Sequence, residues 1–175
     1  MNTAGNKEED IKMKLSKNIW RKISVLGVAG GTGFWVANFA ISRTPISAEY
    51  RTAMSISYIP MLVEALAGGL IIGFGVSFFL LRFFDKIPTK NPILKSIILS
   101  LIALFIATIT IEVPSHFLIP NNNPMRYFFI GFLFNVLRIL ALGIVIGYLY
   151  KRVLPDGRAP ELKSSEAKEA NRLYY

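Results

Sequence analysis

The sequence predicts an all-α integral membrane protein: a four-transmembrane-helix up-down bundle with its N- and C-termini cytoplasmic. Hydrophobic residues make up 53% of the chain and charged residues only 18%, which argues against a soluble globular domain or a disordered chain. Four apolar runs are each long enough to cross a bilayer, and the basic residues alternate between the connections. Because hydrocarbon offers no hydrogen bonds to the backbone, apolar runs of this length predict helices.

The first predicted span covers residues 23–41, and about 22 residues precede it, which argues against a cleaved signal peptide. The second covers residues 56–84 and exceeds the roughly 20 residues that a bilayer requires. Proline is favoured in the first turn of a helix, so Pro60 predicts that the regular helix begins near residues 57–60.

The third span covers residues 93–113, begins after Pro92 and ends at Pro114. The fourth covers residues 127–150 and follows the turn-forming segment 120–124, which is rich in proline and asparagine. No cysteine is present, so neither a disulfide framework nor thiol chemistry is expected.

Polar tails flank the predicted transmembrane domain of residues 23–150. The tails, residues 1–22 and 151–175, and the connection after the second span with its flanks (Arg82, Lys86, Lys90 and Lys95) hold sixteen of the 20 lysines and arginines. The first and third connections hold three, namely Arg43, Arg51 and Arg126. Since basic residues in short loops stay on the cytoplasmic side, both termini are expected there, in the plasma membrane. The net charge of +9 is explained by this topology and by anionic headgroups, so no nucleic-acid partner is expected.

Small residues recur at four-residue steps and predict close helix packing, because lipid provides no hydrophobic drive for helices to associate. The glycines concerned are Gly27, Gly31 and Gly33 in the first span, Gly69 and Gly73 in the second, and Gly143 and Gly147 in the fourth. Two interpretations stay open. Either these ridges only build the bundle, or the glycine-rich first span leaves one ridge for a partner.

Arg138 lies in the middle of the fourth span, where a cation costs about 2.5 to 3.5 kcal/mol unless it finds a partner or water. Other polar residues cluster in the outer half of the spans: Asn38, Glu64, Thr108, Thr110, Glu112 and Asn135. Hydroxyls can bond back to their own helix, whereas amides and charges cannot do so easily. We therefore expect Asn38, Glu64, Glu112, Asn135 and Arg138 to form an outward-facing polar pocket, or else a hydrogen-bond network that fixes helix register.

Glu64 has three possible roles from its position in the second span. It could pair with Arg138, interact with the helix dipole near the helix start, or act as a functional group. The axial offset between Glu64 and Arg138 is roughly 5 to 11 Å, which a side-chain contact bridges only at its lower end.

Catalytic and metal-binding motifs are absent from the sequence, so no enzyme, metal or cofactor is expected. His116 is the only histidine, and with Glu112 it offers at most two ligands of the three or four that zinc takes. It could instead sense pH at the outer surface or be an interfacial bystander.

Three functions follow from these patterns. The first, which we favour, is a non-catalytic accessory or structural subunit of a larger membrane complex. The second is a small oligomeric channel or transporter with a pocket centred on Arg138 and Glu64. The third is a membrane enzyme with Glu64 as acid or base, but no other residue completes such a site.

Overall fold

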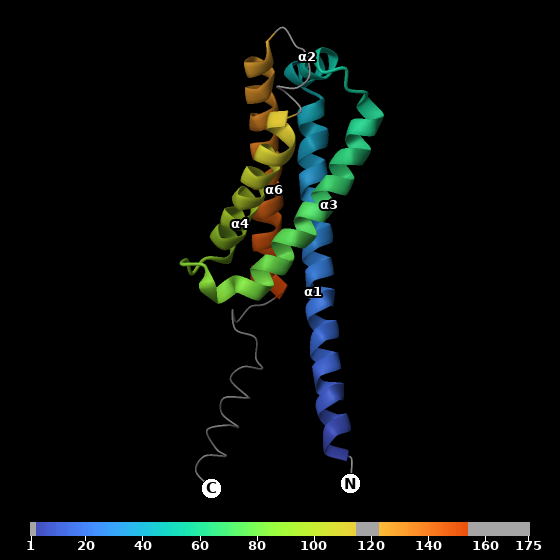
Figure 1. Ribbon diagram of the computed structural model, residues 1–175, viewed down its shortest axis with the longest axis vertical. Helices are drawn as coiled ribbons and strands as arrows, with labels where there is room; N and C mark the ends of the chain where they lie inside the picture. Colours follow the sequence, from blue (N-terminus) through green and yellow to red (C-terminus); the bar gives the residue numbers. More distant parts are fainter. Residues whose placement is uncertain (1–2, 115–122, 154–175) are drawn as a thin grey trace.

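The computed structural model describes residues 3–114 and 123–153, and the side chains of these residues apart from 3–16, 85, 112 and 153. Within this part of the chain every regular element is helical (Figure 1). Four helical segments are long and apolar enough to span a membrane: Lys17–Ser42, Tyr58–Phe83, Pro92–Ile111 and Pro124–Arg152. The prediction of an all-helical chain with four candidate spans is confirmed.

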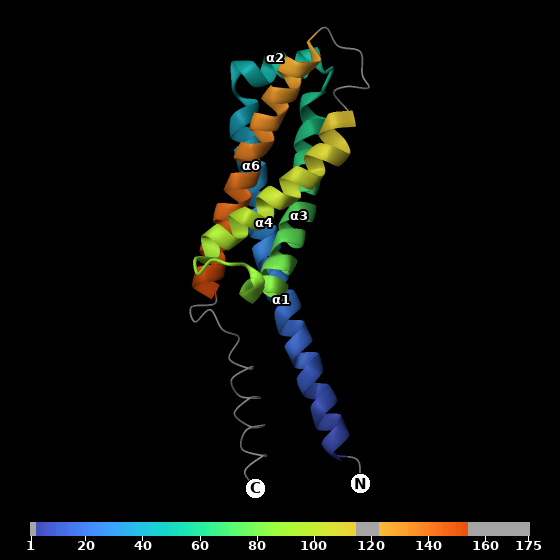
Figure 2. The same ribbon diagram turned by 60° about the vertical axis from the view of Figure 1, so that its left-hand side comes forward.

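Helix α1 (Thr3–Ser42) is much longer than the first predicted span. It projects well beyond the other helices, as Figures 1 and 2 show. The twenty residues before Ile23 add about 30 Å at 1.5 Å per residue. Residues 1–22 were predicted as a polar tail, but residues 3–22 continue the helix. Starting a helix is the costly step, and once the apolar part of α1 has formed, each further residue adds one hydrogen bond.

Helix α2 (Pro45–Ala53) lies in the first connection, where no element was predicted. Thr44 caps its N-terminus, with Oγ1 accepting from the Ser47 N–H at 3.3 Å, and Pro45 occupies the first turn. Arg51 donates through Nη1 to the Ser42 carbonyl at 3.0 Å and to Ser47 Oγ at 3.1 Å. Arg51 thereby places a cation at the C-terminus of α1, where the helix dipole favours one. We call this end of the bundle the α2 end, and the opposite end, from which the first half of α1 projects, the terminal end.

Ser55 closes α2 in a Schellman motif with an unusual residue at its left-handed position. Its φ is 53°, its N–H bonds to the Thr52 carbonyl at 3.2 Å, and the Ile56 N–H bonds to the Arg51 carbonyl at 2.8 Å. Glycine usually occupies this position, because a side chain in the left-handed region costs roughly 1–2 kcal/mol.

We therefore expect Ser55→Gly to raise the free energy of unfolding by about 0.5 to 1 kcal/mol, since strain relief exceeds the added freedom of the unfolded chain. Thermal unfolding in detergent measures this change. The matched control is Ser57→Gly, at a position whose φ of −72° suits any residue. Equal melting temperatures for the two variants would contradict the assignment of strain to Ser55.

Helix α3 (Tyr58–Phe83) begins where Pro60 predicts, and it continues into the short η1 (Phe84–Lys86). Helix α4 (Pro92–Ala107) is capped by Asn91, whose Oδ1 accepts from the Ile93 N–H at 3.0 Å. It passes into one π-helical turn, η2 (Thr108–Glu112), and stays helical as far as Pro114. Helix α6 (Pro124–Val153) starts three residues before the predicted fourth span.

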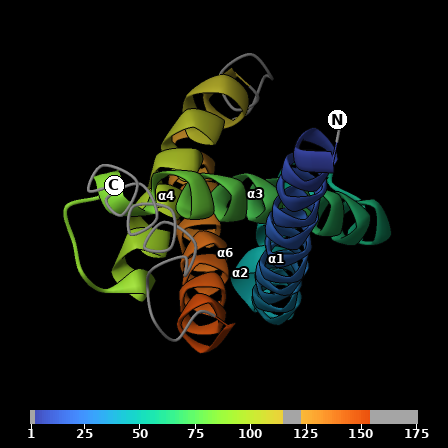
Figure 3. The same cartoon turned by 90° about the horizontal axis from the view of Figure 1, so that it is seen from below.

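The bundle is made of two close helix pairs, α1 with α3 and α4 with α6, and α1 also packs against α6. Helix α3 crosses α1 obliquely (Figure 1), and α4 crosses α6 (Figure 2). Seen from the terminal end, α3 and α4 run in different directions across α1 and α6 (Figure 3).

Glycines allow the two crossings to be close. A Cβ on Gly73 would lie 2.5 Å from the Gly27 carbonyl oxygen, and one on Gly147 would lie 2.5 Å from Ile93 Cα. On α1, Gly27 and Gly31 face α3, whereas Gly30 and Gly33 face α6. These four glycines of α1 thus pack inside the bundle, whereas Cβ atoms on Gly68 and Gly75 of α3 would meet nothing within 4 Å.

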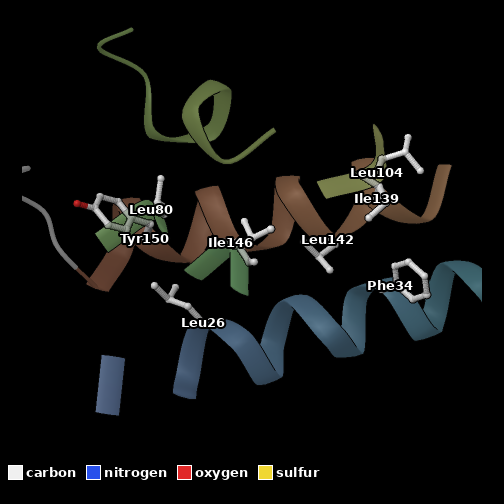
Figure 4. Close-up of a cluster of buried hydrophobic side chains, with 9 residues drawn as sticks. Leu26, Phe34, Leu80, Leu104, Ile139, Leu142, Ile146 and Tyr150 are labelled. Atoms are coloured by element: carbon white, nitrogen blue, oxygen red, sulfur yellow. The ribbon is translucent and has the colours of Figure 1, made fainter. Parts of the chain in front are cut away.

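An apolar core of buried side chains lies between the helices (Figure 4). Its buried residues are Leu26, Phe34, Val76, Leu80, Leu104, Ile139, Leu142, Ile146 and Tyr150. They come from all four long helices, so the core fixes how each helix is rotated about its axis. That rotation decides which polar residues face inward.

Candidate functional site

Arg138 and Asn135 form a polar pair in the middle of α6. Arg138 Nη1 donates to Asn135 Oδ1 at 2.9 Å, and the guanidinium lies 6.0 Å from the centre of the Phe134 ring. Both side chains are half-buried. Arg138 lies about 21 Å from the start of α6, in the middle of the candidate span Pro124–Arg152. The structure thus brings together two residues of the predicted pocket.

A cavity of about 130 Å³ lies beside this pair. All four long helices contribute to its wall, and we call it the interhelical cavity; it is lined by Phe34, Ile72, Leu104, Ala107, Thr108, Ile111, Asn135 and Ile139. Six of these eight residues are apolar. The two polar residues among them are Thr108 and Asn135.

Thr108 is the first residue of the π-helical turn, and its hydroxyl differs from that of its neighbour Thr110. Thr110 Oγ1 donates to the Ile106 carbonyl at 2.8 Å, as hydroxyls in helices commonly do. Thr108 is only 8% exposed, and its Oγ1 has no hydrogen-bond partner in the described part of the chain. Isolated π-helical turns are frequent at functional sites, and the first residue of this one lines the cavity.

Sequence analysis did not assign Thr108 to the site. Hydroxyls were not included in the predicted pocket, because they can bond back to their own helix. The sequence contains no signal that distinguishes Thr108 from Thr110. Only the π-helical turn, which the sequence did not predict, distinguishes the two.

Asn38 lies on α1 one turn beyond Phe34, toward the α2 end, and is completely buried. Neither atom of its amide group has a hydrogen-bond partner among the described residues. A buried amide without partners costs free energy and is rare in native proteins. Asn38 therefore adds a second unsatisfied polar group on the α2 side of the interhelical cavity.

Glu64 does not face the cavity. The Trp35 indole N–H donates to the Leu62 carbonyl at 3.2 Å, and Ala65 packs on the core, so Glu64 points to the opposite side of α3 and is exposed. No cation of the described residues lies within 4 Å of its carboxylate, and the suggested ion pair with Arg138 is not formed. The interaction of a carboxylate with the helix dipole is strongest in the first turn, and Glu64, as the seventh residue of α3, lies beyond that turn.

Two residues of the predicted site fall outside what the structure describes. The backbone of Glu112 ends η2, but its side chain is among those not described. His116 lies outside the described residues altogether. Elsewhere, in the ranges that the structure describes, no cluster of three histidine, aspartate or glutamate residues could hold a metal ion.

The terminal end contains a buried cation that sequence analysis counted only as a basic flank. Lys95 is 4% exposed, and its Nζ donates to the Phe84 carbonyl and lies 3.6 Å from the centre of the Phe84 ring. That ring stacks on Tyr150 at a centroid distance of 4.8 Å. Lys95 thus joins the end of α3 to α4 and α6. At the α2 end, the exposed ion pair of Arg126 and Glu49, 2.8 Å apart, joins α6 to α2.

The interhelical cavity has a mainly apolar wall, and Thr108 and Asn135 are its two polar lining residues. It has neither a nucleophile with an adjacent base nor two carboxylates among its lining residues. No family model, curated protein or solved structure matches this chain.

Proposed function

We propose that this protein is a non-catalytic accessory subunit of a larger membrane complex, and that it binds a partner helix through the outer face of α3. The observation that carries the proposal is the position of Glu64, exposed about 9 Å along α3 from Tyr58. Ionisable residues within membrane helices nearly always face the bundle interior, a water-filled cavity or a partner. Glu64 does none of these within the described residues, so a partner helix is the best way to satisfy it.

The outer α3 face comprises Glu64, Gly68, Ile71, Gly75 and Phe78, which helical spacing places on one side. Ile71 is 73% exposed, and Cβ atoms on Gly68 and Gly75 would meet nothing within 4 Å. Small residues on a membrane helix let a second helix approach closely. The face therefore combines room for a helix with one charge that the helix can neutralise.

The partner expected here is a different protein whose helix presents a cation or an amide at the depth of Glu64. A second copy meeting the same face would place two carboxylates together, which like-charge repulsion disfavours. The cations near the start of α3 are also engaged already. Arg51 bonds to Ser42, Arg126 pairs with Glu49, and the Arg43 guanidinium lies 4.7 Å from the Phe39 ring centre.

Charge at the two ends supports a cytoplasmic position for both termini in the plasma membrane. Exposed or half-buried cations gather at the terminal end, namely Lys17, Arg21, Lys22, Arg82, Lys86, Lys90, Lys151 and Arg152. Three arginines lie at the α2 end, and one of them pairs with Glu49. This asymmetry is what the positive-inside rule associates with the cytoplasmic side.

The test is extraction of a carboxyl-tagged protein from its native membrane in mild detergent, followed by the mass and composition of the eluted complex. We expect a foreign chain in fixed stoichiometry, lost with Gly68→Phe and reduced at least fivefold with Glu64→Leu. Ile102→Phe on the exposed face of α4 is the control and should retain the partner. A pure homo-oligomer would overturn the proposal and favour a channel, and retention by Gly68→Phe would contradict the assigned face.

A further inference from the structure

We infer that the terminal end of the bundle binds an anionic phospholipid, such as phosphatidylglycerol, at the edge where α1 and α3 meet. The residues concerned are Lys17, Trp20 and Arg21 of α1 with Phe78 and Arg82 of α3, and we call them the α1–α3 edge. The inference does not depend on the partner proposed above, although Phe78 also belongs to the outer α3 face. It rests on an aromatic contact, on three cations beside that contact, and on the level of both along the candidate spans.

Trp20 and Phe78 join the two helices at this edge. Their ring centroids are 6.4 Å apart and their planes differ by 29°, yet Trp20 is 58% exposed and Phe78 is 40% exposed. Ile23, three residues further along α1, is 2% exposed, so the stacked pair lies at the margin of the core. The exposed sides of these rings offer an apolar surface to an acyl chain, and tryptophan is enriched where membrane helices meet the headgroup layer.

Three cations flank the stacked rings. Arg21 follows Trp20 directly, Lys17 lies one turn before Arg21, and Arg82 lies one turn after Phe78. Residues four apart on a helix are neighbours, so the ring contact brings the cations of α1 toward the cation of α3. All three basic side chains are exposed, and none forms an ion pair, a hydrogen bond or a ring contact with a described residue.

Negative charge is scarce at this end of the protein. From residue 17 onward, the described part of the terminal end contains one acidic residue, Asp85. Two other cations at this end are already in contact with rings: Lys86 Nζ lies 5.3 Å from the centre of the Phe83 ring, and the Arg152 guanidinium lies 5.0 Å from that of Tyr148. The α1–α3 edge therefore holds an excess of unpaired cations. A phosphate group complements them, because arginine donates parallel hydrogen bonds to phosphate oxygens.

The level of the edge favours a lipid over a soluble anion or an acidic protein segment. Lys17 is the first residue of the candidate span Lys17–Ser42, and Arg82 is the last residue but one of the candidate span Tyr58–Phe83. Cations at the ends of spans meet the headgroup layer, whereas Trp20 and Phe78, about one turn further in, meet the acyl chains. An anionic phospholipid presents a phosphate and an apolar chain at these two levels. Phosphatidylcholine carries its own cation, so it should bind more weakly.

Native mass spectrometry of the full-length protein in a neutral detergent tests the inference, with phosphatidylglycerol and phosphatidylcholine of identical chains as the two probes. We expect phosphatidylglycerol to bind at least tenfold more tightly. Arg21→Gln combined with Arg82→Gln should weaken its binding about 25-fold, since one basic residue near an anionic lipid contributes about fivefold, or about 1 kcal/mol. The matched control combines Lys90→Gln with Lys151→Gln, which removes the same charge from exposed positions at the same end. Its affinity should change less than threefold.

Fluorescence gives a second readout that does not depend on the arginine variants. Phosphatidylglycerol with brominated chains should quench the emission of Trp20, taken as the difference between the wild type and Trp20→Phe. Brominated phosphatidylcholine should quench it at least threefold less at the same concentration. Glu64→Leu, which is expected to weaken the binding of the partner helix, should keep its affinity for phosphatidylglycerol.

Three results would overturn the inference. The first is equal affinity for the two lipids, and the second is an equal loss of affinity in the two double variants. The third is displacement of phosphatidylglycerol by an excess of inorganic phosphate, because this would indicate a site for a free anion and not for a lipid.

Discussion

Replacing Gly73 with alanine is expected to destabilise the protein by about 3 kcal/mol. The new Cβ would lie 2.5 Å from the Gly27 carbonyl oxygen and 3.0 Å from the Gly31 nitrogen. Both neighbours are backbone atoms in the middle of α1, so they cannot move aside as a side chain would. Helices α1 and α3 would have to separate by about 1 Å, losing contacts along the crossing.

Gly75→Ala provides the matched control two residues further along α3. Its Cβ would meet nothing within 4 Å, so the substitution should be neutral, or stabilising by up to about 1 kcal/mol through helix propensity. Thermal unfolding of both variants in the same detergent measures the difference. If the two variants had the same melting temperature, the close approach of α1 and α3 would be contradicted.

Lys95→Met is expected to destabilise the terminal end by about 2 kcal/mol. Methionine keeps much of the length and apolar surface of lysine but removes the hydrogen bond to the Phe84 carbonyl and the cation contact with the Phe84 ring. A charged hydrogen bond contributes about 1.5–3 kcal/mol, and a desolvated cation over an aromatic ring contributes about 2 kcal/mol. The net loss is smaller than their sum, because the variant no longer pays the desolvation cost of a buried charge. The short η1 should also become more accessible, because the Phe84 carbonyl loses its partner.

The control is Lys90→Met, at an exposed position in the same connection. We expect its melting temperature to change by less than 1 °C, since isolated surface charges contribute little. Hydrogen exchange of the η1 amides should rise in the Lys95 variant alone. Unchanged exchange and stability in Lys95→Met would show that this buried lysine does not hold the terminal end together.

The four spans could be predicted because the hydrophobic length needed to cross a bilayer is set by its thickness. Prolines and cap residues set the helix starts, as Asn91 with Pro92 and Pro60 illustrate. The helical segment before Ile23 was missed because a polar sequence indicates where a span ends, but it does not indicate where the helical hydrogen bonds end. Helix α2 was missed although Thr44 and Pro45 are a cap and a first-turn proline, since only nine residues follow.

The candidate site was predictable only in part. The spacing of Asn135 and Arg138 placed both on one helical face, and the hydrogen bond between them agrees with it. Depth arguments brought Glu64 toward Arg138, but depth does not determine how α3 is rotated about its axis. That rotation depends on long-range contacts, such as Trp35 with Leu62, and a single sequence does not show them. The π-helical turn that turns Thr108 inward is equally a product of packing between helices.

The central claim, that the outer α3 face binds a partner protein, is tested most directly by photocrosslinking in the native membrane. A benzophenone amino acid is placed at position 71 on that face, or at position 102 at a similar depth on the exposed face of α4. We predict one crosslinked product of defined mass from position 71, weakened at least fivefold by Glu64→Leu, and no such product from position 102. No protein product from position 71, or the same product from both positions, would contradict the claim.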